Sequence, residues 1–229
     1  MGGLGGDLTM EQEDLRQKAE DFFENVWQRG DPWEFETSEF EKTKYARQLA
    51  LLGGHRYTRA LELGCGAGAF TRLLACHADQ VVALDISPTA IARAGKLEVS
   101  PAAVEFRVAN IMEYNLCAEG PWDLIVLSDT ICYLGWLYSF FEVGWLASQI
   151  FAATRDGGYL LLANTLGAID KIDDILFLPW LIRTYQALFL NIGYRLEAEE
   201  ILHGTKHDAA VDVLISLFAK APATAEHGG

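Results

Sequence analysis

Three glycines at alternate positions follow an acidic residue near the end of an apolar stretch. Residues 60–70 read Ala-Leu-Glu-Leu-Gly-Cys-Gly-Ala-Gly-Ala-Phe, which places Glu62 ahead of Gly64, Gly66 and Gly68. Glycines let a backbone turn sharply and let a ligand lie directly against it. A loop of this kind after the first strand of a βαβ unit marks a cofactor site at the carboxyl edge of a parallel sheet.

This glycine loop fits more than one template. Gly64, Gly66 and Ala69 satisfy the dinucleotide pattern G-x-G-x-x-G/A, and Asp85 follows Gly64 by 21 residues, the spacing of an acid that binds a ribose hydroxyl. An ionised carboxylate suits a diol because it offers two acceptor oxygens and no donor. The loop alone therefore leaves an NAD(P)-dependent oxidoreductase open.

Alternating strand and helix patterns from residue 59 onward would position the loop. Ser87 and Pro88 form a helix start, with serine as N-cap and proline in the first turn, so Asp85 lies just beyond a strand end. The alternation predicts a doubly wound, mostly parallel α/β sheet. The patterns predict strands at 59–63, 80–84, 104–108, 123–128 and 159–164 and helices at 68–77, 88–96 and 137–154.

The two ends of the chain depart from this alternation. Amphipathic patterns predict helices at 10–28 and about 39–53, the second opened by a capping box of Ser38 and Glu41. After Asn164 an apolar helix near 174–191 precedes two consecutive strands, which can pair antiparallel. These last strands are expected at 193–201 and 210–219. We expect a helical cap over the site at 1–57, a core at 58–221 with a substrate-shaping insert near 165–190, and a disordered tail at 222–229.

Composition narrows the class of protein. Hydrophobic residues make up 51% and charged residues 22% of the chain, as in ordinary soluble domains. A net charge of −14 argues against a nucleic-acid partner, because binding a phosphate backbone requires lysine and arginine. The N-terminus lacks a signal-peptide pattern, and the longest apolar run, 175–182, is shorter than the about 20 residues of a membrane span. We expect a cytoplasmic protein with a small-molecule substrate and no membrane insertion.

The four cysteines point the same way. Cys65, Cys76, Cys117 and Cys132 show neither C-x-x-C spacing nor a paired framework. This usage indicates reduced thiols in a cytosol and no zinc site.

Further motifs bear on the choice between templates. Glu-x-Gly-x-Gly-x-Gly resembles the first motif of class I S-adenosylmethionine-dependent methyltransferases. The run from Leu124 to Asp129 resembles the fourth-strand motif of that family, which ends beside the reacting methyl. Asp85 and Asn110 stand where the family binds the ribose and the adenine. The closing strand pair is similar to its antiparallel seventh strand, which dinucleotide folds lack.

Short segments before and after the glycine loop resemble a narrower group of proteins. Asp31-Pro32-Trp33, Thr37-Ser38, Lys44-Tyr45 and Asp85-Ile86-Ser87-Pro88 together look like the nodulation-factor (NodS-like) N-methyltransferases. Members of that group methylate small molecules, including amino sugars. The resemblance implies a seven-stranded sheet with an antiparallel last strand, S-adenosyl-L-methionine as cofactor and S-adenosyl-L-homocysteine as product. It implies a biosynthetic transferase.

The resemblance and the expected positions of the residues together give candidate roles in this sequence. Asp129, Tyr133 and His207 are the candidate catalytic residues, and no metal is expected. The candidate cofactor contacts are Trp33, Tyr45, Glu62, Gly64, Cys65, Gly66, Gly68, Asp85, Ile86, Asn110, Ile111 and Ser128.

The atom that receives the methyl group decides which catalytic residues are needed. A sulfonium already makes its methyl electrophilic, so alignment for in-line attack is the main task. An amine needs only a free lone pair with acceptors such as Asp129 or Tyr133 nearby. A hydroxyl needs a general base, and His203 and His207 lie in the loop between the last two strands. We favour N-methylation; O-methylation with a histidine base and a non-catalytic binding protein on the same fold are alternatives.

An apolar stretch at 175–190, with Pro179 at its centre, is unusual for a helix beside a sheet. It is consistent with a substrate lid, a homodimer interface, a membrane-contacting patch or a helix buried in the core. Trp136, Phe140, Phe141 and Trp145 raise the same alternatives.

Overall fold

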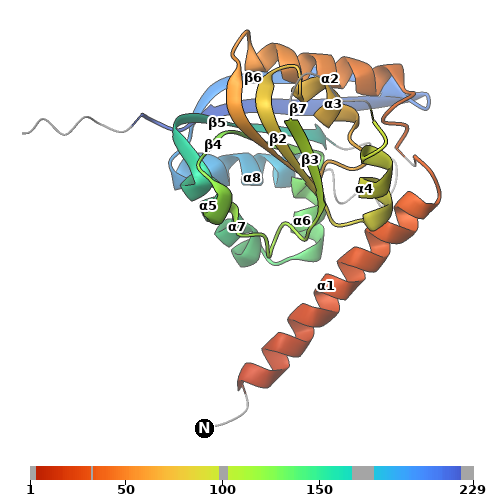
Figure 1. Cartoon of the computed structure of the whole chain (residues 1–229), viewed down its shortest axis with the longest axis vertical. Coiled ribbons are helices and arrows are strands. Elements are labelled where there is room, and N and C mark those ends of the chain that lie inside the picture. Colours follow the sequence, from red (N-terminus) through yellow and green to blue (C-terminus); the bar gives the residue numbers. More distant parts are fainter. Residues whose placement is uncertain (1–3, 32, 98–102, 167–177, 223–229) are drawn as a thin grey trace, which may run out of the picture.

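Seven strands form one sheet with helices on both faces (Figure 1). The computed structural model describes residues 4–31, 33–97, 103–166 and 178–222. The strands follow the order β3-β2-β1-β4-β5-β7-β6 across the sheet. Their bounds are β1 (Tyr57–Leu63), β2 (Ala78–Asp85), β3 (Ala103–Val108), β4 (Trp122–Ser128), β5 (Thr154–Leu166), β6 (Arg195–Lys206) and β7 (Ala209–Ala219).

Strand directions confirm the predicted fold class. Strands β1 to β5 pair in parallel, whereas β7 is antiparallel to both β5 and β6. Helical crossovers join the parallel strands, and a tight hairpin joins β6 to β7, as expected from the two kinds of connection. The chain reverses its direction of travel across the sheet between β1 and β4. In open α/β sheets this point is where ligands bind.

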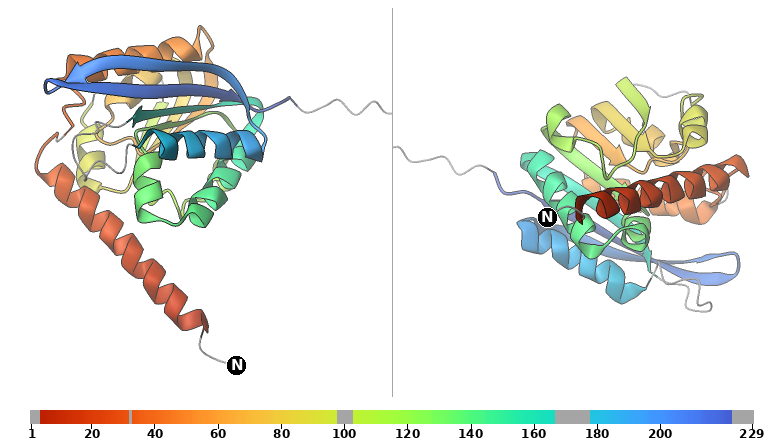
Figure 2. Two further views of the ribbon diagram at one scale, coloured as in Figure 1. Left: turned by 180° about the vertical axis from the view of Figure 1, so that it is seen from behind. Right: turned by 90° about the horizontal axis from the view of Figure 1, so that it is seen from below.

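Eight helices are present in the described part of the chain. The helix α1 extends well beyond the sheet as a long arm, which is plain in Figures 1 and 2. Their bounds are α1 (Leu4–Gln28), α2 (Glu39–Leu52), α3 (Ala69–Leu74), α4 (Pro88–Ala94), α5 (Leu116–Glu119), α6 (Ile131–Leu137), α7 (Phe140–Ala153) and α8 (Pro179–Ile192).

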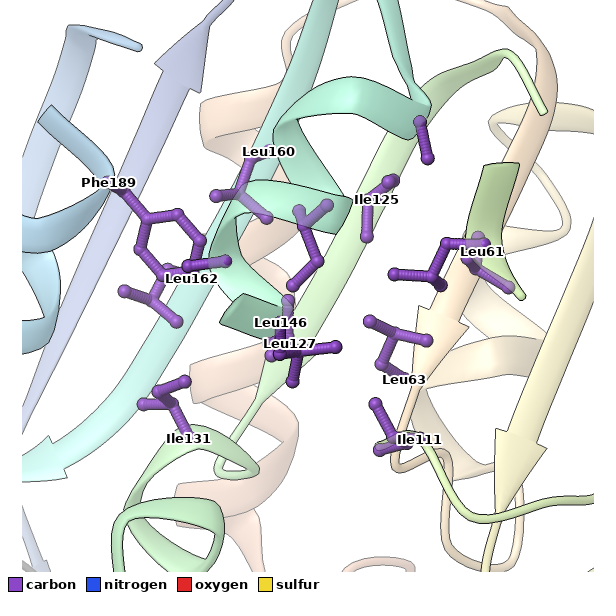
Figure 3. Packing of buried hydrophobic residues seen from close by; sticks show 14 of the residues in the cluster. Leu61, Leu63, Ile111, Ile125, Leu127, Ile131, Leu146, Leu160, Leu162 and Phe189 are labelled. Carbon is purple, nitrogen blue, oxygen red and sulfur yellow. The ribbon is translucent and has the colours of Figure 1, made fainter. Parts of the chain in front are cut away.

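The larger hydrophobic core lies between the sheet and the helices α7 and α8 (Figure 3). Leu61 and Leu63 of β1 both enter this core because alternate side chains of a strand point to the same face. Leu146 of α7 and Phe189 of α8 belong to the same core, in which Phe189 lies beside Leu162 of β5.

The opposite face of the sheet is covered by α2 and α3. Tyr45 of α2 and Phe70 of α3 pack with Ala60, Leu124 and other residues that point to this face. Because α2 contributes to this core, its buried side has a fixed position over the end of β4. The division of the chain into a cap at 1–57 and a core stays a prediction.

One predicted helix start and one predicted cap are wrong. The helix expected at 137–154 is α7, which starts at Phe140 after a capping box of Ser139 and Glu142, and the short helix α6 before it was not predicted. The capping box expected at Ser38 is absent, because the Ser38 side chain makes no cap hydrogen bond and Glu41 is taken up by buried ion pairs. The predicted cap at Ser87 is confirmed, since its hydroxyl accepts from the Ala90 amide.

The apolar helix near the C-terminus starts later than expected. Pro179 occupies the first turn of α8 rather than its centre, where a proline would break a helix. Tyr185 and Phe189 are buried while Trp180 is exposed, so one face of α8 is part of the core. Of the insert predicted near 165–190, residues 167–177 lie outside the described residues, as do residues 223–229 of the predicted tail.

None of the helices in the described ranges has the length and apolarity needed to cross a membrane.

Candidate active site

A cavity of about 380 Å³ opens at the carboxyl ends of the strands. Its size falls within the roughly 300–1,000 Å³ of small-molecule sites. The topology brings nearly all of the predicted site residues to its wall, although they lie far apart in the chain. Those that line it are Trp33, Tyr45, Glu62, Gly64, Cys65, Gly66, Asp85, Ile86, Asn110, Ile111, Ser128, Asp129, Tyr133 and His207.

Two of the loop glycines are required by close approach. At Gly64, with φ +81°, a Cβ would lie 2.5 Å from the Thr130 hydroxyl, which itself donates to the Leu63 carbonyl. At Gly66, with φ +54°, a Cβ would lie 2.7 Å from the indole of Trp27. Both positions are left-handed backbone that favours glycine. The loop is therefore shaped by Thr130 on one side and by α1 on the other.

Gly68 has a different role from the other two. It precedes α3 with φ +82°, and a Cβ there would meet the side chains of Leu97 and Phe106. It does not line the cavity. Its absence of a side chain serves the packing of α3 against the sheet edge, so the structure does not place it among the cavity residues with Gly64 and Gly66.

Asp85, at the end of β2, binds the glycine loop through hydrogen bonds to backbone amides. Its Oδ2 accepts from the Gly66 amide at 2.8 Å and its Oδ1 accepts from the Ser87 amide at 2.9 Å. Burial raises the pKa of this carboxyl to about 6, against the lowering effect of these amides. A carboxylate offers about four acceptor sites. The backbone amides therefore occupy only part of this acceptor capacity.

Glu62, on β1, is buried beneath the same loop. It accepts a hydrogen bond from Thr71 at 2.6 Å. Burial raises its pKa to about 8, which the Thr71 hydroxyl only partly offsets. Among the ion pairs recorded for the described residues, none includes Glu62 or Asp85. The two carboxyls thus face the cavity without a cationic partner.

Asn110 and Ile111, which follow β3, form the next part of the cavity wall. The Asn110 Oδ1 accepts from the Met112 amide at 3.0 Å, and its amide nitrogen donates to the Tyr138 hydroxyl at 3.3 Å. Ile111 is buried beside it and belongs to the core. Asn110 therefore makes a turn and also borders the cavity. We call the part of the cavity lined by Glu62, the glycine loop, Asp85 and Asn110 the β1–β3 half.

The other half lies over the ends of β4 to β6. Asp129 follows β4 with φ +52°, and its Oδ1 accepts from the amide and the hydroxyl of Thr165 at 2.8 and 3.0 Å. Its Oδ2 accepts from Lys44 Nζ at 2.5 Å. Next to it, the Ser128 hydroxyl accepts from Gln48 at 3.0 Å. Asp129 is thus held from two elements, α2 and β5.

Lys44 belongs to a buried network that the sequence reasoning did not find. Its ammonium also pairs with Glu41, and Glu41 pairs in turn with Lys206 of β6 at 2.6 Å. Lys206 donates to the Trp33 carbonyl as well, at 2.6 Å. Glu41 and Lys44 fall at the core-facing spacing of α2, together with Tyr45. Charges at such positions are the sequence signal that could have identified them.

Aromatic side chains close this second half of the cavity. Trp33 stacks on Phe35 at 5.4 Å between ring centroids and meets Trp27 edge-on at 5.5 Å. Tyr133 of α6 packs edge-on against Phe23 of α1 at 5.3 Å. Both predicted aromatics, Trp33 and Tyr133, therefore lie where the N-terminal segment covers the cavity. Trp27 and Phe23 were not predicted.

Glu24 holds the covering helix α1 in place. Its carboxylate accepts from the Ser87 hydroxyl at 2.6 Å and from the amide and hydroxyl of Thr89 at the start of α4. These hydrogen bonds lower the pKa of Glu24 to about 2. The position of Trp27 over the glycine loop follows from this attachment.

The two histidines of the last hairpin lie in different places. His203 pairs with Asp212 at 2.7 Å on the hairpin and does not line the cavity. His207 lies at the turn with φ +50°, and its Nε2 is 3.3 Å from Glu34, which also has a positive φ. The His207 side chain is 66% exposed. It therefore stands at the cavity mouth.

No group of three or more His, Cys, Asp or Glu side chains within the described residues could hold a metal ion.

Comparison with known proteins identifies the family of this chain. The family model described as nodulation protein S (NodS) matches residues 16–139, more than half of the chain. The chain belongs to the NodS family. The matched segment includes the glycine loop, Asp85, Asp129 and Tyr133, whereas Lys206 and His207 lie beyond it.

Individual members and neighbours of the NodS family agree with this placement. Nodulation protein S of Rhizobium tropici is 31% identical over 139 residues, covering 60% of this chain and 56% of that protein. Phosphoethanolamine N-methyltransferase 1 of Arabidopsis thaliana is 31% identical over 129 residues, covering 56% of this chain and 26% of that protein. The chain spans about half the length of the curated NodS relatives it matches.

A solved NodS structure shares the fold. It is the N-methyltransferase NodS of Bradyrhizobium japonicum WM9 in complex with S-adenosyl-L-homocysteine. The match has a TM-score of 0.65 at 20% sequence identity and covers 83% of this chain and 92% of that one.

Proposed function

We propose that this chain transfers the methyl group of S-adenosyl-L-methionine to an amine of a small molecule. One observation carries the proposal: Glu62 and Asp85 face the cavity beside the glycine loop and have no cationic partner among the described residues. Burying uncompensated carboxylates is unfavourable unless a ligand supplies positive charge. The proposed cofactor carries both a sulfonium and an ammonium group. The complex of the related NodS with S-adenosyl-L-homocysteine supports the proposal.

The β1–β3 half of the cavity fits such a cofactor. Gly64 and Gly66 line the cavity, and Thr130 and Trp27 fill the positions that side chains of these two residues would take. The remaining acceptor capacity of Asp85 suits the ribose hydroxyls. Asn110 and Ile111 would border the adenine, and Glu62 would lie near the ammonium. The bound cofactor supplies an electrophilic methyl, and the residues of the chain hold and orient it.

An amine acceptor suits the other half better than a hydroxyl. Burial raises the pKa of Asp129, but the charge and hydrogen bond of Lys44, with the Thr165 hydrogen bonds, hold it below its ordinary value. Burial raises the pKa of Tyr133 well above its ordinary value. Neither group would accept a proton from a hydroxyl near neutral pH. A free amine requires no such base.

Asp129 and Tyr133 are proposed to orient the amine. Three hydrogen bonds already reach the Asp129 carboxylate, which leaves about one acceptor site for an N–H of the acceptor. Holding nucleophile and methyl about 3–3.5 Å apart in line can supply roughly 7–11 kcal/mol of the barrier. O-methylation with His207 as base remains the second candidate, supported by the position of His207 at the cavity mouth.

Thermal melting with two ligands tests the cofactor. S-adenosyl-L-homocysteine at 100 times its dissociation constant should stabilise the chain by about 2.7 kcal/mol. NADH at the same concentration should leave the melting temperature unchanged. Stabilisation by NADH alone would overturn the proposal and favour an oxidoreductase.

Mass spectrometry of methylated products tests the acceptor. Glucosamine, phosphoethanolamine and catechol, each incubated with the cofactor and the chain, separate amino-sugar, phospho-amine and phenol acceptors. We expect methylation of an amine. Cofactor binding without methylation of any acceptor would favour the non-catalytic alternative.

The remaining parts of the proposal concern the cellular location and the oligomeric state of the protein. A cytoplasmic location stays a prediction. A homodimer is supported only by exposed aromatic side chains near α6 to α8. These are Trp136, Phe140, Phe141, Trp145 and Trp180.

A further inference from the structure

The carboxylates in the two halves of the cavity differ in whether they have cationic partners. In the β1–β3 half, Glu62 and Asp85 have no lysine or arginine partner in the described part of the chain. In the other half, Glu41 and Asp129 both pair with lysines. This second half, which we call the acceptor half, is where the proposed acceptor would bind.

Within the acceptor half, the charges of the paired lysines and carboxylates cancel. Lys44 contacts both Glu41 and Asp129, and Lys206 contacts Glu41 at 2.6 Å. Two carboxylates and two ammonium groups sum to a formal charge of zero. Lys44 is 1% exposed and Glu41 is 3% exposed, so water screens these charges little. The other titratable groups that face this half are Asp31, Glu34, Tyr45, Tyr133 and His207, and Glu62 acts on Tyr45 from the β1–β3 half.

Lys44 is charged in this environment. Burial by itself would lower its pKa, but the negative charges of Asp129 and Glu41 and their hydrogen bonds raise it above the ordinary value. The rings of Phe35 and Tyr45, 5.5 and 5.4 Å from Nζ, also favour a cation.

Charge balance matters because only an unprotonated amine is a nucleophile. An ammonium group has no lone pair with which to attack a methyl. An uncompensated carboxylate within about 4–6 Å favours the charged form of a base and shifts its pKa by about 1–3 units. A net negative acceptor half would therefore bind the acceptor as its unreactive ammonium form.

We propose that Lys44 and Lys206 compensate Glu41 and Asp129 so that the acceptor amine binds as its uncharged free base. The inference rests on the proposed methyl transfer. In that step the nitrogen lone pair forms the N–C bond while the C–S bond breaks and its electron pair stays on sulfur. The positive charge passes from sulfur to nitrogen, and one N–H proton then leaves to water. Lys44 and Lys206 are positioning residues in this scheme, because they act through the two carboxylates.

Ligand binding tests this without any acceptor. Sinefungin carries an amine in place of the transferable methyl, so its affinity relative to S-adenosyl-L-homocysteine reports on the preference for a cation at that point. Lys44→Met keeps the length of the side chain but leaves one negative charge among the paired groups uncompensated. We expect calorimetry to show sinefungin gaining about tenfold or more in affinity relative to S-adenosyl-L-homocysteine.

Two further variants separate charge from packing. Lys44→Met combined with Glu41→Gln restores a formal charge of zero, so the affinity ratio should return toward that of the original chain. A merely structural role predicts the opposite, with the double variant more damaged than the single one. Lys42→Met is the matched control, because Lys42 is exposed on the same helix and pairs with the exposed Glu39.

Turnover of whichever amine is methylated gives a second readout. Lys44→Met should lower both KM and kcat at pH 7, and kcat should recover as the pH rises by about two units. If Lys44→Met fails to fold, Lys206→Met makes the same change in charge from a partly exposed position.

The outcomes distinguish the two proposals. If the original chain binds neither ligand, the proposed function fails. If it binds both but the affinity ratio is unchanged in Lys44→Met, or the rate loss is the same at every pH, the charge-compensation inference is overturned.

Discussion

The Lys44 ammonium lies 2.5 Å from the Asp129 carboxylate, although the two residues are 85 positions apart in the chain. Lys44 comes from the helix that precedes the sheet, and Asp129 comes directly after the central strand β4. A helix outside the βαβ core thus completes the site at the end of that core. Removing one partner of a buried pair costs about 3–5 kcal/mol, because the other charge is left buried alone.

Replacing Asp85 with asparagine should weaken cofactor binding. The amide would turn an acceptor oxygen into a donor that faces the Gly66 or Ser87 amide. Loss of a charged hydrogen bond costs about 1.5–3 kcal/mol, or roughly 10- to 150-fold in the dissociation constant of S-adenosyl-L-homocysteine. Calorimetric titration measures it. Asp79→Asn on the same strand, where Asp79 is exposed and pairs with Arg56, should change the constant by less than about threefold. Unchanged affinity in Asp85→Asn would mean that the ribose lies elsewhere.

Replacing Gly66 with alanine should disrupt the contact between the glycine loop and α1. Its Cβ would lie 2.7 Å from Trp27, and the positive φ disfavours any side chain. We expect a loss of at least about tenfold in cofactor affinity and a lower melting temperature. Gly54→Ala is the control, because nothing lies within 4 Å of its added Cβ. If Gly66→Ala binds the cofactor normally, α1 does not rest on the loop in solution.

The stability of the ligand-free chain should depend on the protonation of Glu62. Its pKa of about 8 lies above the ordinary 4.5, so between these values the folded chain holds a proton that the unfolded chain has released. The stability that this proton contributes is full below about pH 4.5 and is lost as the pH rises through about 8. Glu62→Gln imitates the protonated form. It should match the original chain at pH 5 and exceed its stability at pH 9, by on the order of 4 kcal/mol at most.

Denaturant unfolding at the two pH values measures this difference. The exposed Glu39→Gln should follow the original chain at both. A Glu62→Gln variant that is equally less stable at every pH would show that Glu62 is ionised throughout.

Loss of His207 should spare methylation of an amine. Because His207 has a left-handed backbone, asparagine is the suitable replacement. If the acceptor is an amine, His207→Asn should retain kcat within about threefold, since no general base is needed. His203→Asn, on the same hairpin but away from the cavity, controls for hairpin stability. A loss of roughly 100-fold or more in His207→Asn alone would instead support a hydroxyl acceptor with His207 as base.

The glycine loop, the helix start at Ser87 and the antiparallel final strands could be predicted from the sequence. Each depends on residues close together in the chain: glycine conformation at Gly64 and Gly66, a cap before Pro88, and a short connection between two strands. Asp85 could be placed for the same reason, because it follows directly from the end of its own strand.

The partners of these residues could not be predicted, because they come from remote parts of the chain. Trp27 contacts Gly66 because α1 packs against the rest of the protein. Lys44 pairs with Asp129 because α2 packs against the sheet. Glu41 shows the difference most clearly. Its spacing from Ser38 indicates a local capping box, but the buried lysines on α2 and β6 bind its carboxylate instead. Local patterns therefore determine the strands, the turns and the cofactor loop, whereas the charge environment of the acceptor half arises from packing between distant elements.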